Sequence, residues 1–420
     1  MKIKVINAPF EKVKALKKPK FIAKRPNLLF RTLVRILVSG ELRYCNFSFT
    51  KTRMDDIGKG PYFILMNHSC FLDLKIAFRL FYPMAVMPVA TTDALMGKAW
   101  LMRQLGCIPT RKFVTDVPLV KNIMRAIQKL KTSVLMYPEA GYSFDGRKTV
   151  LQKGLGRLFK RLDVPVIMVK TDGAFLHDPL YNNLKQRKTK VTAEVKCLFN
   201  RDELKEKTNE EIDAVLEEEF SFNAFKKQLA DKRKVEEKFR AEGLHRILFR
   251  CPHCQSEGKT VGEGITLTCK ECGAVYEMTE YGSLNCRTGE GKFNSVTDWY
   301  DWQKECVKRD ISAGQYREEI PVDIGIVADY KALYKVGAGS LLHDESGITI
   351  TGCNSDLFYH HPAKLSYTLN SDFYWYEMGD VISVGDDKML YYCFPQNGFP
   401  VAKARIAAEI LYENIKNKGN

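Results

Sequence analysis

The sequence predicts a layered α/β domain with a mostly parallel sheet, followed by a four-cysteine ribbon and a small barrel-like β domain closed by a C-terminal helix. Three observations support this prediction. Short apolar runs alternate with helical patterns over 60–200, two Cys-x2-Cys pairs follow at 251–272, and strand-like segments begin near 320. Alternating strands and helices favour a parallel sheet. A chain of 420 residues is long enough for two or three domains.

The first sixty residues are strongly basic. They hold fifteen Lys and Arg against four acidic residues, so most of the net charge of +15 lies at this end. The stretch "LLFRTLVRILV" at 28–38 predicts a helix that is too short to span a membrane, since a span needs about 20 apolar residues. We expect residues 1–40 to form a basic, amphipathic arm on an anionic membrane surface. An ordinary core helix would fit the same pattern, and no secretory signal is evident.

The α/β domain is expected over 41–200. Apolar runs that favour strands alternate here with segments of helical periodicity. A charged helical connector should follow over 201–250, where Thr208 and Glu211 have the spacing of a capping box. The expected strands are 62–66, 85–90, 133–138, 164–169 and 190–199, and the expected helices are 72–81, 116–131 and 151–162.

The last part of the chain, 291–420, predicts a β-rich domain. A curled sheet closed by one C-terminal helix resembles, in layout alone, the small barrels of the pleckstrin-homology or GRAM type. Its sequence contains a hairpin pattern with a turn at 345–347. The expected elements are a helix at 295–311, the hairpin at 339–352, strands at 364–369, 380–385 and 388–394, and a helix at 401–416.

Two knuckles of cysteine predict a zinc ribbon over 251–290. Each pair is separated by two residues, and fourteen residues lie between the pairs. Four thiolates leave no ligand position for water, so the zinc is expected to be structural. Thiolate ligands suit a reducing compartment. The expected ligands are Cys251, Cys254, Cys269 and Cys272.

A histidine ends the first apolar strand of the α/β domain. His68 follows "PYFILMN", and Asp73 lies five residues later. Positions five apart do not share a helix face, but the two side chains can meet if His68 lies on the loop and Asp73 in the first turn of the next helix. The carboxylate would then orient the imidazole, and the free nitrogen could accept a proton. Alone, the pattern would equally suit a capping or structural histidine.

Four segments together resemble the motifs of the glycerolipid acyltransferases, the family that includes 1-acyl-sn-glycerol-3-phosphate acyltransferase. "NHSCFLD" matches the first motif, Asn-His followed by four residues and Asp. "GCIPTRK" at 106–112 resembles the second motif, "YPEAGYS" at 137–143 the third, and "VPVIMV" at 164–169 the fourth. The segments occur in the family's order within 40–200.

The resemblance implies a role for each matched residue. His68 would deprotonate the acceptor hydroxyl, Asp73 would orient His68, and backbone N–H groups just after His68 are candidate oxyanion donors. The acyl donor would be acyl-CoA or acyl-ACP, the acyl thioester of acyl carrier protein, with no catalytic metal. The substrate-binding residues implied are Arg111 and Lys112 for phosphate, Glu139 for the glycerol portion, and Gly141 and Ser143 in the same loop.

The third motif departs from the family. Ala140, Gly141 and Tyr142 stand where Gly, Thr and Arg are usual, so a phosphate contact is lost unless Arg147 or Lys148 replaces it.

We expect an acyltransferase that converts lysophosphatidate to phosphatidate, is peripheral on the inner face of the cell membrane, and does not bind nucleic acid. The alternatives are another lipid hydroxyl acceptor, or a lipid-binding scaffold with a decayed active site.

Overall fold

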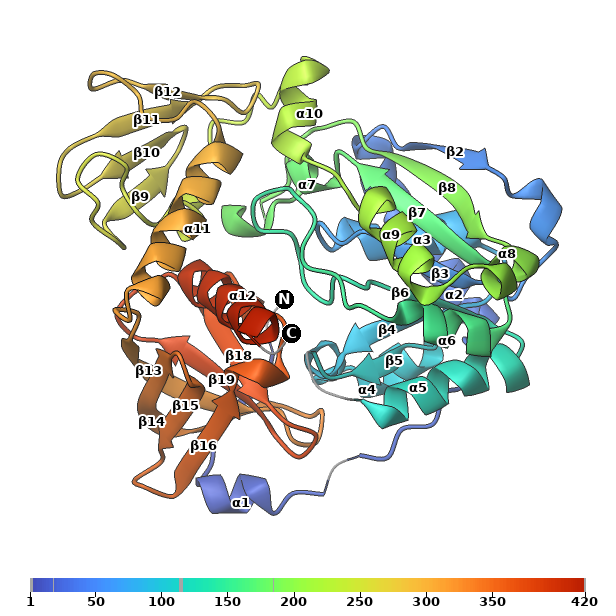
Figure 1. Cartoon of the computed structure of the whole chain (residues 1–420). Helices are drawn as coiled ribbons and strands as arrows, with labels where there is room; N and C mark the ends of the chain where they lie inside the picture. The colour runs from blue at the N-terminus through green and yellow to red at the C-terminus, as the bar shows by residue number, and fades with distance from the viewer. Residues whose placement is uncertain (1–2, 18, 113–115, 184, 419–420) are drawn as a thin grey trace.

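The computed structural model describes residues 3–17, 19–112, 116–183 and 185–418. An α/β domain, a small four-stranded sheet and a larger curled sheet lie around the helix that ends the chain (Figure 1). Within the described part, no helix is both long and apolar enough to cross a membrane.

The α/β domain is built on a seven-stranded sheet. Every neighbouring pair of strands is parallel except Val166–Asp172 and Thr192–Phe199, which are antiparallel to each other. The mostly parallel sheet is therefore as predicted. The sequence missed the two short edge strands. The order is β2 (Ser48–Thr52), β8 (Thr192–Phe199), β7 (Val166–Asp172), β3 (Phe63–Met66), β6 (Ser133–Met136), β4 (Val86–Thr91) and β5 (Ile108–Thr110).

Helices cover both faces of this sheet, which is why β3 is a continuous apolar run rather than an alternating one. Phe63 and Leu65 face one buried cluster, and Ile64 and Met66 face the other. The first face is covered by α5 (Val117–Met124), α6 (Leu155–Leu162), α8 (Arg201–Glu206) and α9 (Asn209–Glu219), and the second by α2 (Leu28–Tyr44) and α3 (Leu72–Phe81).

The predicted connector over 201–250 is partly wrong. The capping box of Thr208 and Glu211 is present, but α8 and α9 pack on the sheet instead of linking domains through solvent. The helical pattern ends with α10 (Ala224–Ala230). Beyond it, the Val235 N–H donates to the carbonyl of Glu280 in the ribbon. The segment 231–240, predicted as helical, is not a helix, because tertiary contacts can override local helix propensity.

The ribbon is a four-stranded antiparallel sheet, as its cysteine spacing suggests. It is joined to the last domain by α11 (Val296–Ser312), which packs against α12 (Val401–Lys418). The strand order is β12 (Leu284–Cys286), β11 (Val275–Met278), β10 (Thr266–Cys269) and β9 (Thr260–Glu263).

The C-terminal sheet is curled and covered by α12, but its edge strands β16 and β17 do not pair to close a barrel. The strand predicted over 364–369 is wrong, because a short helical turn, Ala363–Leu365, lies there against α12. The pleckstrin-homology likeness stays a prediction. The order is β16 (Leu357–Pro362), β15 (Gly347–Gly352), β14 (Leu333–Asp344), β13 (Glu318–Ile326), β19 (Leu390–Pro395), β18 (Val381–Gly385) and β17 (Asn370–Asp372).

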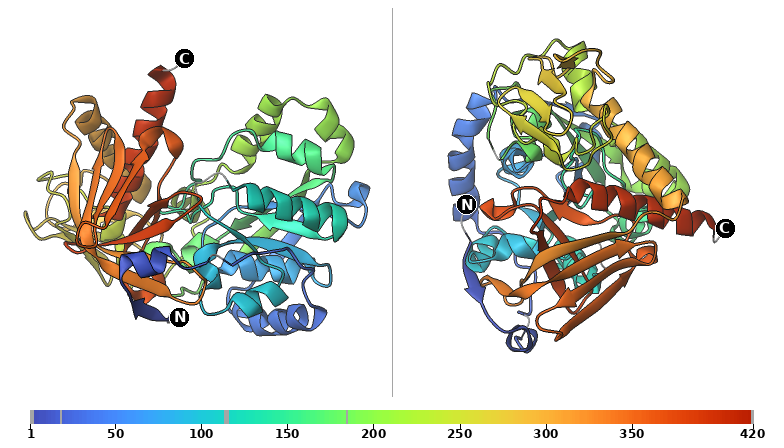
Figure 2. Two further views of the ribbon diagram at one scale, coloured as in Figure 1. Left: turned by 90° about the horizontal axis from the view of Figure 1, so that it is seen from below. Right: turned by 90° about the vertical axis from the view of Figure 1, so that its left-hand side faces the viewer.

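The N-terminal segment belongs to this last sheet, which corrects the expectation of a separate arm over 1–40. The strand β1 (Val5–Asn7) pairs in parallel with β14, and α1 (Phe10–Lys14) follows it along the sheet (Figures 1 and 2). Phe10 and Val13 are buried in the same core as the C-terminal strands. The rest of the predicted arm lies on the α/β domain: Ala23 is buried in its core and donates its N–H to Asn122 at 2.7 Å, and α2 follows.

One buried core also links the three units. It contains Phe144 and Phe175 of the α/β domain, Tyr276 of the ribbon, and Phe373 and Ile406 of the C-terminal domain. Large apolar interfaces of this kind hold domains in one arrangement. The C-terminal domain is therefore seated on the α/β domain rather than tethered to it.

Candidate active site

His68 lies on the loop between β3 and α3, as predicted. The strand ends at Met66 because Asn67 turns away to bind the end of β7: its side-chain oxygen accepts from the Thr171 N–H at 2.7 Å. The asparagine of the Asn-His pair therefore fixes the loop. His68 is left at the carboxyl end of a parallel strand, where open α/β sheets place their ligands.

Asp73 lies in the first turn of α3 and faces His68. Its Oδ2 atom is 3.4 Å from His68 Nδ1, and its side chain is fully buried. This separation is long for a hydrogen bond, and such bonds commonly tighten only when substrate is bound. The Thr171 hydroxyl lies between two acceptors, 3.1 Å from Asn67 Oδ1 and 3.2 Å from the other Asp73 oxygen, Oδ1.

The backbone donors just after His68 are already used. The N–H groups of Ser69 and Cys70 donate to Asp73 Oδ2 at 2.6 and 3.0 Å. The expectation that they would form an oxyanion hole is therefore wrong for these two groups, because each N–H has one proton to donate. Their contribution is to hold the Asp73 carboxylate beside the imidazole.

The loop after β6 holds the peptide of His68 from both sides. Glu139 Oε2 accepts from the His68 N–H at 2.7 Å, and the Ser143 N–H donates to the His68 carbonyl at 3.0 Å. The second Glu139 oxygen accepts from the Thr149 N–H at 2.9 Å. Glu139 and Ser143 thus position His68. Their predicted contacts with substrate, and that of the neighbouring buried Gly141, remain predictions.

Burial sets the protonation of the two central groups. Desolvation lowers the pKa of His68; Asp73 opposes this effect, and the charge of Lys112 adds to it. Burial raises the pKa of Glu139 to about 7, against the opposing effect of its two backbone donors. A histidine with a lowered pKa is neutral near pH 7, which is the form that a general base requires.

Two tyrosine rings pack against the imidazole. The centroid of Tyr137 lies 3.9 Å and that of Tyr142 lies 4.2 Å from the centroid of the His68 ring. The Tyr137 hydroxyl is buried and has no hydrogen-bond partner within the described part of the chain. Burial raises the pKa of both phenols well above the ordinary value, so both stay neutral donors.

Four cations were candidates for phosphate binding, and three of them have partners. Arg111, just after β5, donates to the Asp387 carbonyl. Arg147 makes a two-pronged ion pair with Asp301 at 2.7 Å for each bond, and Lys148 pairs with Glu217. The fourth candidate is Lys112, whose charge acts on the pKa of His68.

The C-terminal domain reaches the same loop. Arg405 on α12 donates from Nη1 to the Tyr142 carbonyl at 3.2 Å, and its guanidinium lies 4.5 Å from the Phe144 ring centroid. Phe144 packs on Phe373 with ring centroids 4.3 Å apart. Trp375 Nε1 donates to Asp93 Oδ2 at 3.2 Å. Residues separated by more than two hundred positions therefore meet where the C-terminal domain contacts the α/β domain, and one of them, Tyr142, also packs on His68.

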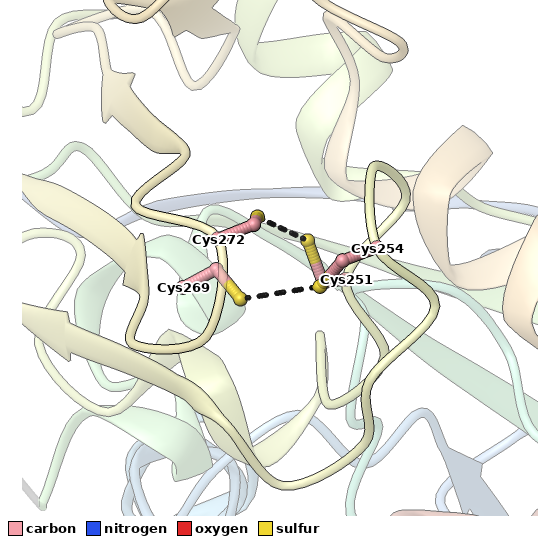
Figure 3. Close-up of side chains that lie close together, drawn as sticks. All are labelled: Cys251, Cys254, Cys269 and Cys272. Carbon is pink, nitrogen blue, oxygen red and sulfur yellow. Dashed lines mark hydrogen bonds between the residues drawn. The ribbon is translucent and has the colours of Figure 1, made fainter.

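The four predicted cysteines form one cluster (Figure 3). Their sulfur atoms all lie within 4.8 Å of one another, and Cys251–Cys272 and Cys254–Cys269 are each 3.7 Å apart. His253 is not among them; its Nε2 contacts the Tyr276 hydroxyl at 2.8 Å. The cluster could hold a metal ion with four sulfur ligands.

Sequence reasoning missed three residues that contact His68, Asp73 or the loop that holds His68. Thr171 has no motif of its own, and it reaches Asp73 because β7 lies next to β3 in the sheet. Tyr137 stands where the third motif usually has Phe, which was the one available signal. Arg405 comes from the far end of the chain, and nothing in its local sequence marks it.

Comparison with known protein families agrees with this geometry. Residues 48–170 match the family model described as Acyltransferase. No curated protein matches. Among solved structures, the 1-acyl-sn-glycerophosphate (LPA) acyltransferase PlsC from Thermotoga maritima is similar at 17% identity and a TM-score of 0.35, over 46% of this chain and 81% of that one. The family match includes both the His68 loop and the Glu139 loop.

Proposed function

We propose, from the match of residues 48–170 to the Acyltransferase family model, that the protein transfers an acyl group to the hydroxyl of lysophosphatidate, giving phosphatidate. The acyl donor is acyl-CoA or acyl-ACP, the acyl thioester of acyl carrier protein. The single observation that most supports the proposal is the placement of His68 at a strand end, facing a buried Asp73 and fixed through its own peptide.

In the proposed reaction His68 is the general base. Asp73 holds the proton on Nδ1, so Nε2 accepts the proton of the acceptor hydroxyl. The hydroxyl oxygen attacks the thioester carbonyl carbon, the tetrahedral intermediate collapses, and the carbon–sulfur bond breaks. The thiolate leaves with the proton returned by the imidazolium. A positioned base of this kind contributes typically 10²–10⁴-fold to the rate.

The oxyanion needs donors other than Ser69 and Cys70, which bind Asp73. We propose the Tyr137 hydroxyl for this role. It belongs to a ring stacked on His68, it is buried, and it has no other partner in the described residues. Leaving a buried hydroxyl unpaired costs about 1–3 kcal/mol, and a bound thioester oxygen would remove that cost.

The acceptor phosphate is assigned to Lys112, with Arg111 beside it. Lys112 acts electrostatically on His68, so a phosphate bound there would lie near the reacting hydroxyl. Glu139, Gly141 and Ser143 are proposed to shape the glycerol subsite from the loop that grips His68.

A second acceptor class has a specific observation in its favour. Tyr142 replaces the usual arginine with an apolar ring on His68, and the substitute cations Arg147 and Lys148 are tied up in ion pairs. An uncharged lipid alcohol such as monoacylglycerol would tolerate this environment better than a phosphate would.

Membrane contact is proposed for one face of α2. The apolar side chains of this face recur every three or four residues and are exposed, and Phe30 contacts the exposed Trp100 of α4 (Ala99–Gln104) edge-on at 5.4 Å. Arg31 and Arg35 instead contact Pro83 and Tyr82. We propose a peripheral location on the inner face of the cell membrane. The exposed apolar residues are Leu28, Leu29, Leu33, Ile36 and Leu37.

Zinc is the proposed metal of the four-cysteine cluster. A tetrahedral zinc site with bonds of about 2.3 Å has sulfur–sulfur edges of about 3.8 Å. Two of the sulfur pairs, Cys251–Cys272 and Cys254–Cys269, are at 3.7 Å. The metal would stabilise the ribbon and take no part in acyl transfer.

The test uses the purified full-length protein with radiolabelled acyl-CoA and acyl carrier protein. Lysophosphatidate, other lysolipids and monoacylglycerol are offered as acceptors. Transfer to lysophosphatidate by the wild type, lost in a folded His68→Ala variant, is the expected result. Equal transfer to monoacylglycerol would favour the uncharged acceptor, and no transfer to any acceptor would refute the function.

A further inference from the structure

One buried arginine links the C-terminal helix to the residues around His68. We propose that Arg405 is a positioning residue for acyl transfer: it fixes Tyr142 against His68, so the C-terminal domain is a working part of the active site. This inference rests on the proposed function and deepens it. It assigns the last domain a role at the catalytic base.

Arg405 is well placed to fix the loop. Only 6% of the residue is exposed, and Nη1 donates to the Tyr142 carbonyl at 3.2 Å. Its guanidinium lies over the Phe144 ring, and Nε donates to Glu409 on its own helix at 3.3 Å. A planar guanidinium with several partners holds a fixed orientation better than a lysine ammonium does.

The held residue contacts the base directly. The ring of Tyr142 packs on the His68 imidazole, and the following residue, Ser143, donates its N–H to the His68 carbonyl. Arg405 therefore acts on the peptide between the ring that touches His68 and the N–H that holds its backbone. A displacement of about 1 Å in a reacting group can cost about 10²-fold in rate.

Other contacts keep the domain seated without Arg405. Phe144 and Phe373 pack together, and Arg147 pairs with Asp301 from α11 through two bonds. Removing the guanidinium should therefore loosen Tyr142 while the domains stay together. A loss of activity without separation of the domains would therefore indicate that Arg405 positions Tyr142, and not that it is needed for domain docking.

The same helix offers a matched control. Lys403, also 6% exposed, is a buried cation of α12. It pairs with Glu257 and Glu318 and lies over the Tyr316 ring, and among the described residues none of these partners belongs to the Tyr142 loop. Arg405→Met and Lys403→Met each remove one buried charge and keep an unbranched apolar chain. Similar losses of thermal stability are expected from both.

The experiment compares these two variants in the full-length protein. Arg405→Met should lose about 10–100-fold in kcat with little change in the KM for the acyl donor, whereas Lys403→Met should keep near-normal kcat. A second readout needs no activity. The ring protons of His68, assigned by comparison with His68→Gln, are shifted by the adjacent tyrosine rings, and Arg405→Met should move them while Lys403→Met does not.

Unchanged kcat and unchanged His68 signals in Arg405→Met would overturn the proposal. If that variant does not fold, Arg405→Lys, which keeps the charge but loses the planar fork, is judged by the same two readouts. A wild type without any transferase activity would refute the proposed function alone, since the His68 signals still report whether Arg405 positions the ring.

Discussion

The contact between Asp73 and His68 gives a quantitative prediction for Asp73→Asn. Asp73 Oδ2 accepts from Ser69 N and Cys70 N and lies 3.4 Å from His68 Nδ1, and Oδ1 lies 3.2 Å from the Thr171 hydroxyl. An asparagine can place its oxygen at the Oδ2 position and its NH2 group toward Thr171, because a hydroxyl also accepts hydrogen bonds. The fold should therefore persist, and the Nδ1–H tautomer should be kept.

What the variant loses is charge. The imidazolium that forms during transfer would face a neutral amide instead of a carboxylate. A hydrogen bond to a charged group is worth about 1.5–3 kcal/mol, so kcat should fall by about 10- to 150-fold. That loss is smaller than the 10²–10⁴-fold expected when the base itself is removed.

The assay is transfer from labelled donor under saturating acceptor, with far-UV circular dichroism as the folding check. Thr171→Val is the matched control, since it removes a neighbour of Asp73 but leaves the carboxylate. It should cost much less activity than Asp73→Asn. Full activity in Asp73→Asn, or an equal loss in both variants, would refute the reasoning.

Three further predictions concern pH, membrane and metal. Burial raises the pKa of Glu139 from 4.5 to about 7, so between these pH values the folded state binds more protons than the unfolded state. The free energy of unfolding should therefore fall as the pH rises from 4.5 to 7. Urea unfolding of Glu139→Gln should lack this dependence of the free energy on pH. In vesicle flotation, Leu37→Glu, which changes a residue 79% exposed on α2, should weaken binding to anionic vesicles by about 10-fold or more. The control Phe358→Glu, which changes a residue 74% exposed on β16, should bind normally. Cys254→Ser should lose bound zinc by elemental analysis and expose the ribbon to protease, and full zinc content would exclude this ligand set.

Local patterns predicted the α/β core well. The strand β3 and the helix Leu72–Phe81 could be predicted because the pattern of apolar residues within each element reflects which of its faces are buried. His68 and Asp73 were singled out by the resemblance to the first family motif, and they face each other because the loop between β3 and α3 is short. The strand at 364–369 failed because packing against α12, distant in sequence, decides its conformation.

Long-range partners were beyond sequence reasoning. The Ser69 and Cys70 N–H groups seemed available as oxyanion donors, but a carboxylate three or four residues away takes both. Arg405 and Thr171 reach the site only through the tertiary fold. A hydrogen bond between two domains does not change the pattern of apolar and polar residues in either segment, so the sequence gives no sign of it.

The pairing of β1 with β14 has a consequence for biosynthesis. Val5 faces Leu333, so the partner strand is synthesised roughly 330 residues later. At about 5–20 residues per second, the α/β domain can fold while β1 and α1 wait for about 15–65 s with Phe10 and Val13 uncovered. A nascent chain must shield this apolar segment until the C-terminal sheet emerges, and a truncated chain that stops before β14 leaves it permanently exposed. Expression of the catalytic domain alone should therefore give aggregation-prone material unless residues 5–14 are also removed.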